Sequence, residues 1–276
     1  MELLHKLFFA FLSGFSEFVM VSGDAHQALY MRVTGIDKPD DLVVMAIHLG
    51  LLGALWLSCK KRVRELMYAH KLASSTRRRK TRTPDPSAIM DARIINTASI
   101  PAVIGLLLKN LLPADIANPG WISLFLLINC IVLYIPRLFG TGNKDSLSYT
   151  MLDGFLMGLL AVAGILPGIS RLACLFCVGL LRGAERKYSL ELSLLIMFPI
   201  TIGLGAMDGY SVLLSGVALT GYGFLGCILG FLGSFAGAFL AMRLIRHFSD
   251  RINTASFACY SGGFAIFQFL VYILIP

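Results

Sequence analysis

The sequence has few charged residues for its length, since Asp, Glu, Lys and Arg make up only 14% of the 276 residues. Hydrophobic residues account for 57%, and the mean hydropathy is +0.76. A soluble domain needs more polar side chains than this to cover its surface, so the composition excludes an ordinary soluble protein. The sequence also lacks the short segments of alternating hydrophobicity that are typical of a transmembrane β-barrel.

Long apolar segments fill most of the chain instead. Windows long enough to cross about 30 Å of hydrocarbon recur throughout, which predicts an all-α polytopic membrane protein forming a single integral membrane domain, residues 1–276. The apolar segments lie at residues 3–34, 41–58, 88–111, 119–138, 148–182, 189–207, 218–244 and 254–275.

Two of these segments, 3–34 and 148–182, are too long for one span. SEFVMVSGDAH interrupts the first at 16–26, and ILPGISR interrupts the second at 165–171. Proline, glycine and polar clusters end helices, so each segment predicts a helical hairpin that enters and leaves the membrane on one side. Two full spans per segment is the alternative, which the short arms disfavour.

Positive charge is distributed unevenly along the chain. The net charge is +8, and the stretch 59–87 alone holds ten of the 24 Lys and Arg residues. Cytoplasmic loops of membrane proteins carry such an excess. We therefore expect 59–87 to be a basic cytoplasmic loop, with both termini on the outer side. The membrane explains the basicity, so nucleic acid is not an expected partner.

With this orientation, the two hairpins enter from opposite faces and three spans follow each one. The sequence therefore predicts six spanning helices plus two re-entrant hairpins in an inverted-topology repeat, with halves at 1–138 and 139–276. Such folds place their binding site where the broken helices meet near the midplane. Residues 17–26 and 165–171 are expected to face each other.

Arg171 lies in the middle of ILPGISRLACLFC, where an arginine is costly unless it faces a partner or water. Its guanidinium group binds phosphate through two parallel hydrogen bonds. A helix arm that begins at Ser170 also offers an N-terminus, which favours anions. Arg171 is thus a candidate phosphate-binding residue, and a structural ion pair with Glu17 or Asp24 is the alternative.

The first broken segment supplies acids, a hydroxyl group and an imidazole. Glu17 is a candidate metal ligand or general base, and His26 is a candidate proton shuttle. Ser22 and Ser170 are candidate nucleophiles, although membrane serines often bond their own backbone. Asp24 is either an N-cap or a second acid. Acids beside a phosphorylated substrate need a divalent cation to reduce repulsion, so Mg²⁺ or Ca²⁺ is expected.

Two motifs carry a resemblance to a known family. GFSEFVMVSGDAH resembles the first signature of the undecaprenyl pyrophosphate phosphatases, the bacitracin-resistance family, which reads approximately E-G-x-x-E-F-x-P-V-S-S-T-G-H. LPGISRLA resembles the second signature, P-G-x-S-R-S-G. The resemblance continues in order through AIHLGLLGALWLSCKKR, IPAVIGLLL and SLELSLLIMFPITIG. It implies an inverted-repeat protein of the bacterial inner membrane that hydrolyses undecaprenyl diphosphate with a divalent metal, recycling this lipid carrier for peptidoglycan and other cell-wall polymers.

The resemblance also implies roles for single residues. Glu17, Ser22 and His26 take the places of the second acid, the first serine and the histidine of the first signature. Ser170 and Arg171 match the Ser-Arg pair of the second. The candidate site comprises catalytic Glu17, Ser22, His26, Ser170 and Arg171, substrate-binding Gly23, Gly168, Ser170 and Arg171, and metal-binding Glu17 and Asp24.

The chain departs from the first signature at several positions. Ser13 stands where the family has its first glutamate, and Gly23 and Asp24 replace the second serine and the threonine. Losing a carboxylate weakens metal binding and losing a hydroxyl lowers the rate, whereas Asp24 restores a negative charge at a new position. The leading interpretation is a polyprenyl diphosphate phosphatase. A non-hydrolytic transporter or flippase of a polyprenyl phosphate or related anion is the alternative, and a structural subunit of an envelope-polymer complex is a minor third.

Glycine recurs at three- and four-residue steps in the seventh apolar segment, between 223 and 237. Small residues on one helix face let two backbones approach closely. This stripe predicts close helix packing, either inside the fold or across a homodimer.

Overall fold

The computed structural model describes residues 3–36, 38–74, 85–140, 142–216 and 220–274. Within these ranges the secondary structure is helical and contains no β-strand, which confirms the predicted all-α class. The α-helices are α1 (Leu3–Glu17), α2 (Gly23–Thr34), α3 (Asp41–Ser74), α4 (Pro86–Leu107), α5 (Pro119–Tyr134), α6 (Met151–Ala161), α7 (Arg171–Leu181), α8 (Arg186–Ser215), α9 (Gly221–His247) and α10 (Thr254–Leu274).

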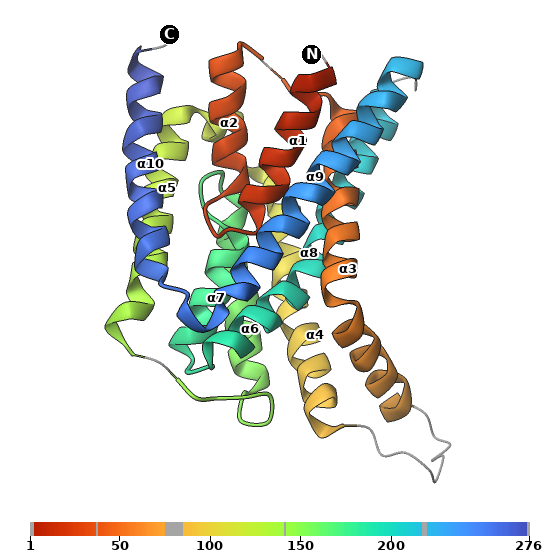
Figure 1. The fold of residues 1–276 in the computed structure, drawn as a ribbon, viewed down its shortest axis with the longest axis vertical. Coiled ribbons are helices and arrows are strands. Elements are labelled where there is room, and N and C mark those ends of the chain that lie inside the picture. The colour runs from red at the N-terminus through yellow and green to blue at the C-terminus, as the bar shows by residue number, and fades with distance from the viewer. Residues whose placement is uncertain (1–2, 37, 75–84, 141, 217–219, 275–276) are drawn as a thin grey trace.

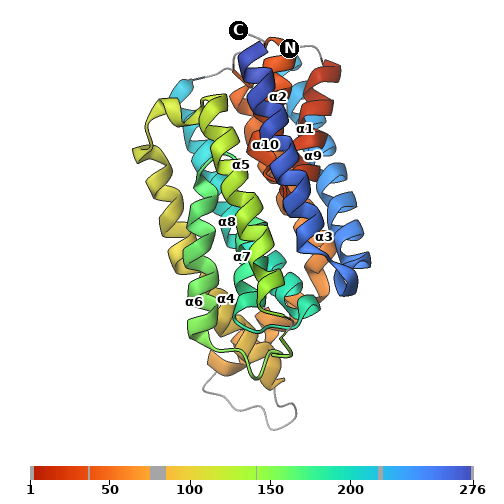
Figure 2. The same cartoon turned by 90° about the vertical axis from the view of Figure 1, so that its left-hand side faces the viewer.

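Six long helices run along the length of the bundle (Figure 1). Each is long and apolar enough to cross a membrane, and each overlaps one of the six single spans predicted from the sequence. The chain is therefore a multi-pass membrane protein. In both views, α1 begins and α10 ends at the same end of the bundle (Figures 1 and 2). The six helices are α3, α4, α5, α8, α9 and α10.

The predicted loop at 59–87 is wrong in its first part, because α3 continues as a helix to Ser74. Lysine, arginine and glutamate are good helix formers, and Arg62 pairs with Glu65 one turn later at 3.0 Å. Charge thus ends the apolar segment without ending the helix. Residues 75–84 lie outside the described residues.

The next helix, α4, has a defined start. Asp85 is its N-cap and accepts from the N–H and the hydroxyl of Ser87, at 3.0 and 2.7 Å. The hydrogen bonds from Ser87 lower the pKa of the Asp85 carboxyl. Pro86 follows at the first helical position, where its missing N–H costs nothing.

Two pairs of shorter helices, α1 with α2 and α6 with α7, form hairpins. The longest of the four helices, α1, has 15 residues and reaches about 22 Å at roughly 1.5 Å per residue, less than the hydrocarbon thickness of about 30 Å. The hairpins enter from opposite ends of the bundle, and their tips meet in its interior (Figure 1). Three long helices follow each hairpin. This is the order that an inverted repeat requires, while the re-entrant membrane placement and the repeat itself stay predictions.

Both tips contain backbone that few residues adopt. Met20 and Ser22 have φ of 64° and 61° between α1 and α2, a left-handed conformation that costs a non-glycine residue free energy. The predicted break at Pro-Gly forms the other tip, where Gly168 has φ of 118°. A Cβ on Gly168 would lie 2.7 Å from the carbonyl oxygen of Ile122 on α5. Only glycine therefore lets this tip pack so closely.

The glycine stripe on α9 packs inside the fold. A Cβ on Gly233 would lie 2.6 Å from the carbonyl oxygen of Leu7 on α1, and one on Gly230 would lie 3.3 Å from Val43 on α3. The prediction of close helix packing is confirmed, and the stripe holds the first hairpin against the bundle.

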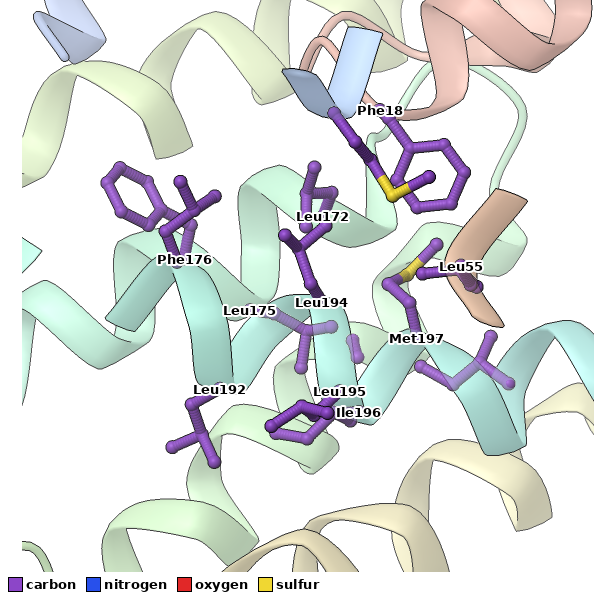
Figure 3. Close-up of a cluster of buried hydrophobic side chains, with 14 of the residues drawn as sticks. Phe18, Leu55, Leu172, Leu175, Phe176, Leu192, Leu194, Leu195, Ile196 and Met197 are labelled. Atoms are coloured by element: carbon purple, nitrogen blue, oxygen red, sulfur yellow. The ribbon is translucent and has the colours of Figure 1, made fainter. Parts of the chain in front are cut away.

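A layer of large apolar side chains lies beside the two tips. Figure 3 shows Phe18 from the first tip together with Leu172 of α7 and Met197 of α8. All three side chains are buried. This packing fixes the helices from which the polar residues of the tips project.

Candidate active site

The tips of the two hairpins contact each other inside the bundle, as the sequence predicts. Arg171, the first residue of α7, donates from Nε to Oε1 of Glu17 at 2.9 Å and from Nη2 to Oε2 at 3.0 Å. Glu17 is the last residue of α1. Both side chains are buried, so a two-point ion pair joins the hairpins.

Arg171 is also held within its own hairpin. Its Nη1 donates to the carbonyl oxygen of Gly164 at 3.2 Å. The helix begins where the sequence predicts, because Ser170 is the N-cap of α7 and its Oγ accepts from the N–H of Ala173 at 3.2 Å. The guanidinium group therefore lies at a capped helix N-terminus, where the helix dipole adds to its positive charge.

Ser22 and Gly168 form a second contact between the tips. The N–H of Gly168 donates to Ser22 Oγ at 3.1 Å. Gly23 is buried beside Glu17, because a Cβ on Gly23 would lie 2.9 Å from Oε2 of Glu17. Arg171 and Glu17 are 154 positions apart in the sequence, and Gly168 and Ser22 are 146 apart, yet both pairs meet at the hairpin tips.

His26 is buried on α2, and both of its ring nitrogens have partners. Nδ1 lies 2.8 Å from the carbonyl oxygen of Ser22, and Nε2 lies 2.8 Å from the hydroxyl oxygen of Tyr260 on α10. A carbonyl oxygen only accepts, so Nδ1 carries a proton, and Nε2 of the neutral ring accepts from Tyr260. Phe264 stacks on the imidazole with a centroid separation of 4.2 Å. His26 is thereby connected to α10.

Asp24 lies half-buried in the first turn of α2. The N-cap position belongs to Ser22, so the alternative role of Asp24 as a cap is wrong. Asp24 follows Gly23, which lies against Oε2 of Glu17. Asp24 is therefore a second acid near the tips.

Acidic ligands for a metal are few near the tips. The described part of the chain contains no group of three or more His, Cys, Asp and Glu side chains that could hold an ion. Both oxygens of Glu17 already accept from Arg171. Mg²⁺ is usually held by one or two carboxylates together with substrate phosphates and water, so Glu17 and Asp24 would supply only part of the ligands of a divalent cation.

Two polar residues near the tips were not among the sequence candidates. Asn129 of α5 is fully buried and bonds to both tips, through the carbonyl oxygen of Met20 and the N–H of Ser170. A buried amide in the apolar stretch WISLFLLINCIVLY was the signal that could have found it. Tyr260 lies on a long apolar helix, and its sequence context gives no such signal.

Comparison with known proteins gives a similarity along nearly the whole chain. The family model described as bacitracin resistance protein BacA matches residues 6–267. An undecaprenyl-diphosphatase from Thermosipho melanesiensis is 26% identical over 267 residues, covering 96% of this chain and 98% of that protein. An undecaprenyl-diphosphatase from Jannaschia sp. is 28% identical over 255 residues, covering 90% and 92%. One from Methanococcus maripaludis is 22% identical over 268 residues, covering 97% and 100%.

Proposed function

The chain belongs to the family of the bacitracin resistance protein BacA, and on this premise we propose that it hydrolyses undecaprenyl diphosphate to the monophosphate and inorganic phosphate. The observation that carries the proposal is the buried Arg171, held at the start of α7 between two hairpin tips. The reaction would recycle a lipid carrier for cell-envelope synthesis.

Arg171 is the residue that binds the diphosphate. A guanidinium group keeps its charge, and its planar fork matches two phosphate oxygens. Glu17 balances that charge before the substrate binds, through the two bonds of the ion pair. An arriving phosphate competes with Glu17 for the same donors, so binding exchanges one anionic partner of Arg171 for another.

The N-terminal end of α7 completes the phosphate site. Ser170 and Gly168 contribute backbone and hydroxyl groups beside Arg171. Gly23 lies against Oε2 of Glu17, so space on the side of α2 opens when Glu17 moves away. The N-terminus of a helix stabilises negative charge that develops on phosphate oxygens.

Hydrolysis breaks the bond between the bridging oxygen and the terminal phosphorus, and the monophosphate leaves with the electron pair of that bond. The nucleophile is either a water molecule or the hydroxyl of Ser170 or Ser22. If a serine attacks, it becomes a phosphoserine, which water then cleaves. His26 accepts the nucleophile's proton at Nε2 and passes it on. In the resting site this nitrogen is bonded to Tyr260, so proton transfer begins by breaking that bond.

The expected Mg²⁺ or Ca²⁺ stays a prediction, with Glu17 and Asp24 as its predicted ligands, and no step above depends on it. We further propose that the chain lies in the bacterial inner membrane with the basic stretch 59–87 in the cytoplasm and both termini outside. The concentration of Lys and Arg in 59–87 supports this orientation. A homodimer also stays a prediction.

The proposal is tested with purified protein, undecaprenyl diphosphate, and parallel arms that contain Mg²⁺, Ca²⁺ or EDTA. We expect inorganic phosphate and undecaprenyl phosphate to appear in equal amounts. Binding of the lipid without release of phosphate would instead favour the transporter or flippase interpretation, which the named relatives do not favour.

A further inference from the structure

Asn129 occupies a position that no motif of the chain assigns. It lies on α5, outside both hairpins, and its side chain has no exposed surface. Burial of an amide without hydrogen bonds costs several kcal/mol in an apolar environment, on the order of 2–7 by transfer measurements. The partners of this amide therefore explain why it is there.

The amide bonds to both hairpin tips at once. Its Oδ1 accepts from the N–H of Ser170 at 3.0 Å, and its Nδ2 donates to the carbonyl oxygen of Met20 at 3.4 Å. A third bond runs from Nδ2 to Oγ of Ser261 on α10, at 3.3 Å. Because the N–H only donates and the carbonyl oxygen only accepts, the orientation of the amide is fixed.

Each tip group needs a partner from outside its own hairpin. Ser170 is the N-cap of α7, so its N–H is not part of the helical hydrogen-bond ladder. Met20 has a left-handed backbone conformation, which persists only where the surroundings hold it. One amide satisfies both groups, and an apolar or purely accepting side chain of the same size satisfies at most one.

We propose that Asn129 is a positioning residue, which sets the distance between the first tip and the start of α7. Glu17 and Ser22 flank Met20 in the tip that bonds to Nδ2 of Asn129. Ser170 and Arg171 lie in the tip that bonds to its Oδ1. Asn129 does not touch the reacting atoms. It holds in register the two sets of groups that must meet the same diphosphate, so this inference depends on the proposed function.

The test compares Asn129→Asp and Asn129→Leu with wild type and with Ser123→Ala. Aspartate retains the size and the acceptor for Ser170 but cannot donate to Met20 when ionised, and leucine has neither group. Ser123 is a matched control because it is also buried on α5, where its hydroxyl bonds to the carbonyl oxygen of Pro119. The measurements are kcat and KM for undecaprenyl diphosphate, per folded molecule, and the melting temperature in detergent.

We expect kcat of both Asn129 variants to fall by about 100-fold, the effect of misplacing reacting groups by roughly 1 Å, while KM changes less than threefold. Ser123→Ala should retain the wild-type kcat. Unchanged kcat in Asn129→Asp, or failure of both Asn129 variants to fold while Ser123→Ala folds, would overturn the positioning role. Phosphate release by wild type is measured before that of any variant. Its absence would count against the proposed function rather than against the positioning role.

Discussion

The hydroxyl group of Tyr260 donates to Nε2 of His26 across 2.8 Å, from the last helix of the chain to the second. The opposite nitrogen, Nδ1, is bonded to the carbonyl oxygen of Ser22. These two bonds select one tautomer of the neutral imidazole, with the proton on Nδ1 and the lone pair on Nε2. If His26 accepts the nucleophile's proton at Nε2, as we propose, Tyr260 fixes the direction of the lone pair that receives it.

Replacing Tyr260 by phenylalanine tests this relationship. Tyr260→Phe retains the ring beside Phe264 but removes the hydroxyl, so His26 loses the bond that orients its lone pair. We expect the rate of phosphate release to fall about tenfold, less than the roughly 100-fold or greater loss expected for removing a general base altogether, as in His26→Ala. The exposed Tyr210 on α8 provides the control Tyr210→Phe. Equal rates for Tyr260→Phe and wild type would show that the bond has no part in catalysis.

The buried ion pair between Glu17 and Arg171 predicts that removing both charges destabilises the protein less than removing the charge of Arg171 alone. Arg171→Met leaves a buried carboxylate without its partner, which costs about 3–5 kcal/mol in soluble proteins. Glu17→Gln with Arg171→Met removes both charges, so its melting temperature should exceed that of Arg171→Met. Neither variant should release phosphate. A double variant less stable than Arg171→Met would mean that the unpaired Glu17 carboxylate is not what destabilises Arg171→Met.

Ser170 has two roles that substitution separates. As the N-cap of α7 it accepts from the N–H of Ala173, and alanine at a cap costs about 1 kcal/mol whereas glycine costs only a few tenths. Ser170→Gly should therefore melt at a higher temperature than Ser170→Ala. If the hydroxyl is the nucleophile, both variants lose activity to the same extent. If Ser170→Gly keeps the wild-type rate, the nucleophile is water or Ser22.

The missing acid of the first signature can be restored at Ser13. This residue is buried one helical turn before Glu17, and its hydroxyl bonds to the carbonyl oxygen of Phe9. Ser13→Glu places a second carboxylate beside Glu17, which supplies the oxygen ligands that a divalent cation needs. We expect calorimetry to detect tighter Ca²⁺ or Mg²⁺ binding, and the rate of hydrolysis to rise.

Gly23→Ser would restore the second serine of the first signature, but the new side chain has little room. A Cβ there would lie 2.9 Å from Oε2 of Glu17, so Glu17 must shift before the serine fits. The gain in rate should therefore come mainly from Ser13→Glu. A folded Ser13→Glu protein with neither cation binding nor faster hydrolysis would show that the pocket does not use a protein-held metal.

Much of the fold follows from local properties of the sequence. The six long helices were predictable because hydrocarbon thickness sets the length of an apolar span. The break at Pro167 and Gly168 was predictable because proline and glycine interrupt helices. The order of hairpins and spans predicted that residues 17–26 and 165–171 face each other, and the contact between Glu17 and Arg171 confirms that the two tips meet.

Other features depend on contacts that local sequence does not encode. Hydropathy marks where α3 leaves the apolar region but not that the helix continues to Ser74. The bond between His26 and Tyr260 joins residues 234 positions apart, and that between Asn129 and Met20 joins residues 109 positions apart. Such pairs are set by how the helices pack, so single-sequence periodicity does not reveal them.

The central claim is that Arg171, at the junction of the two tips, binds the diphosphate that is hydrolysed. The most direct measurement is phosphate release from undecaprenyl diphosphate by wild type, Arg171→Ala and Arg243→Ala, purified in parallel and reconstituted in liposomes. Arg243 is an exposed arginine on α9 and controls for loss of charge. We expect release by wild type and Arg243→Ala and none by Arg171→Ala. Release by Arg171→Ala at the wild-type rate would contradict the role of Arg171 in binding the diphosphate.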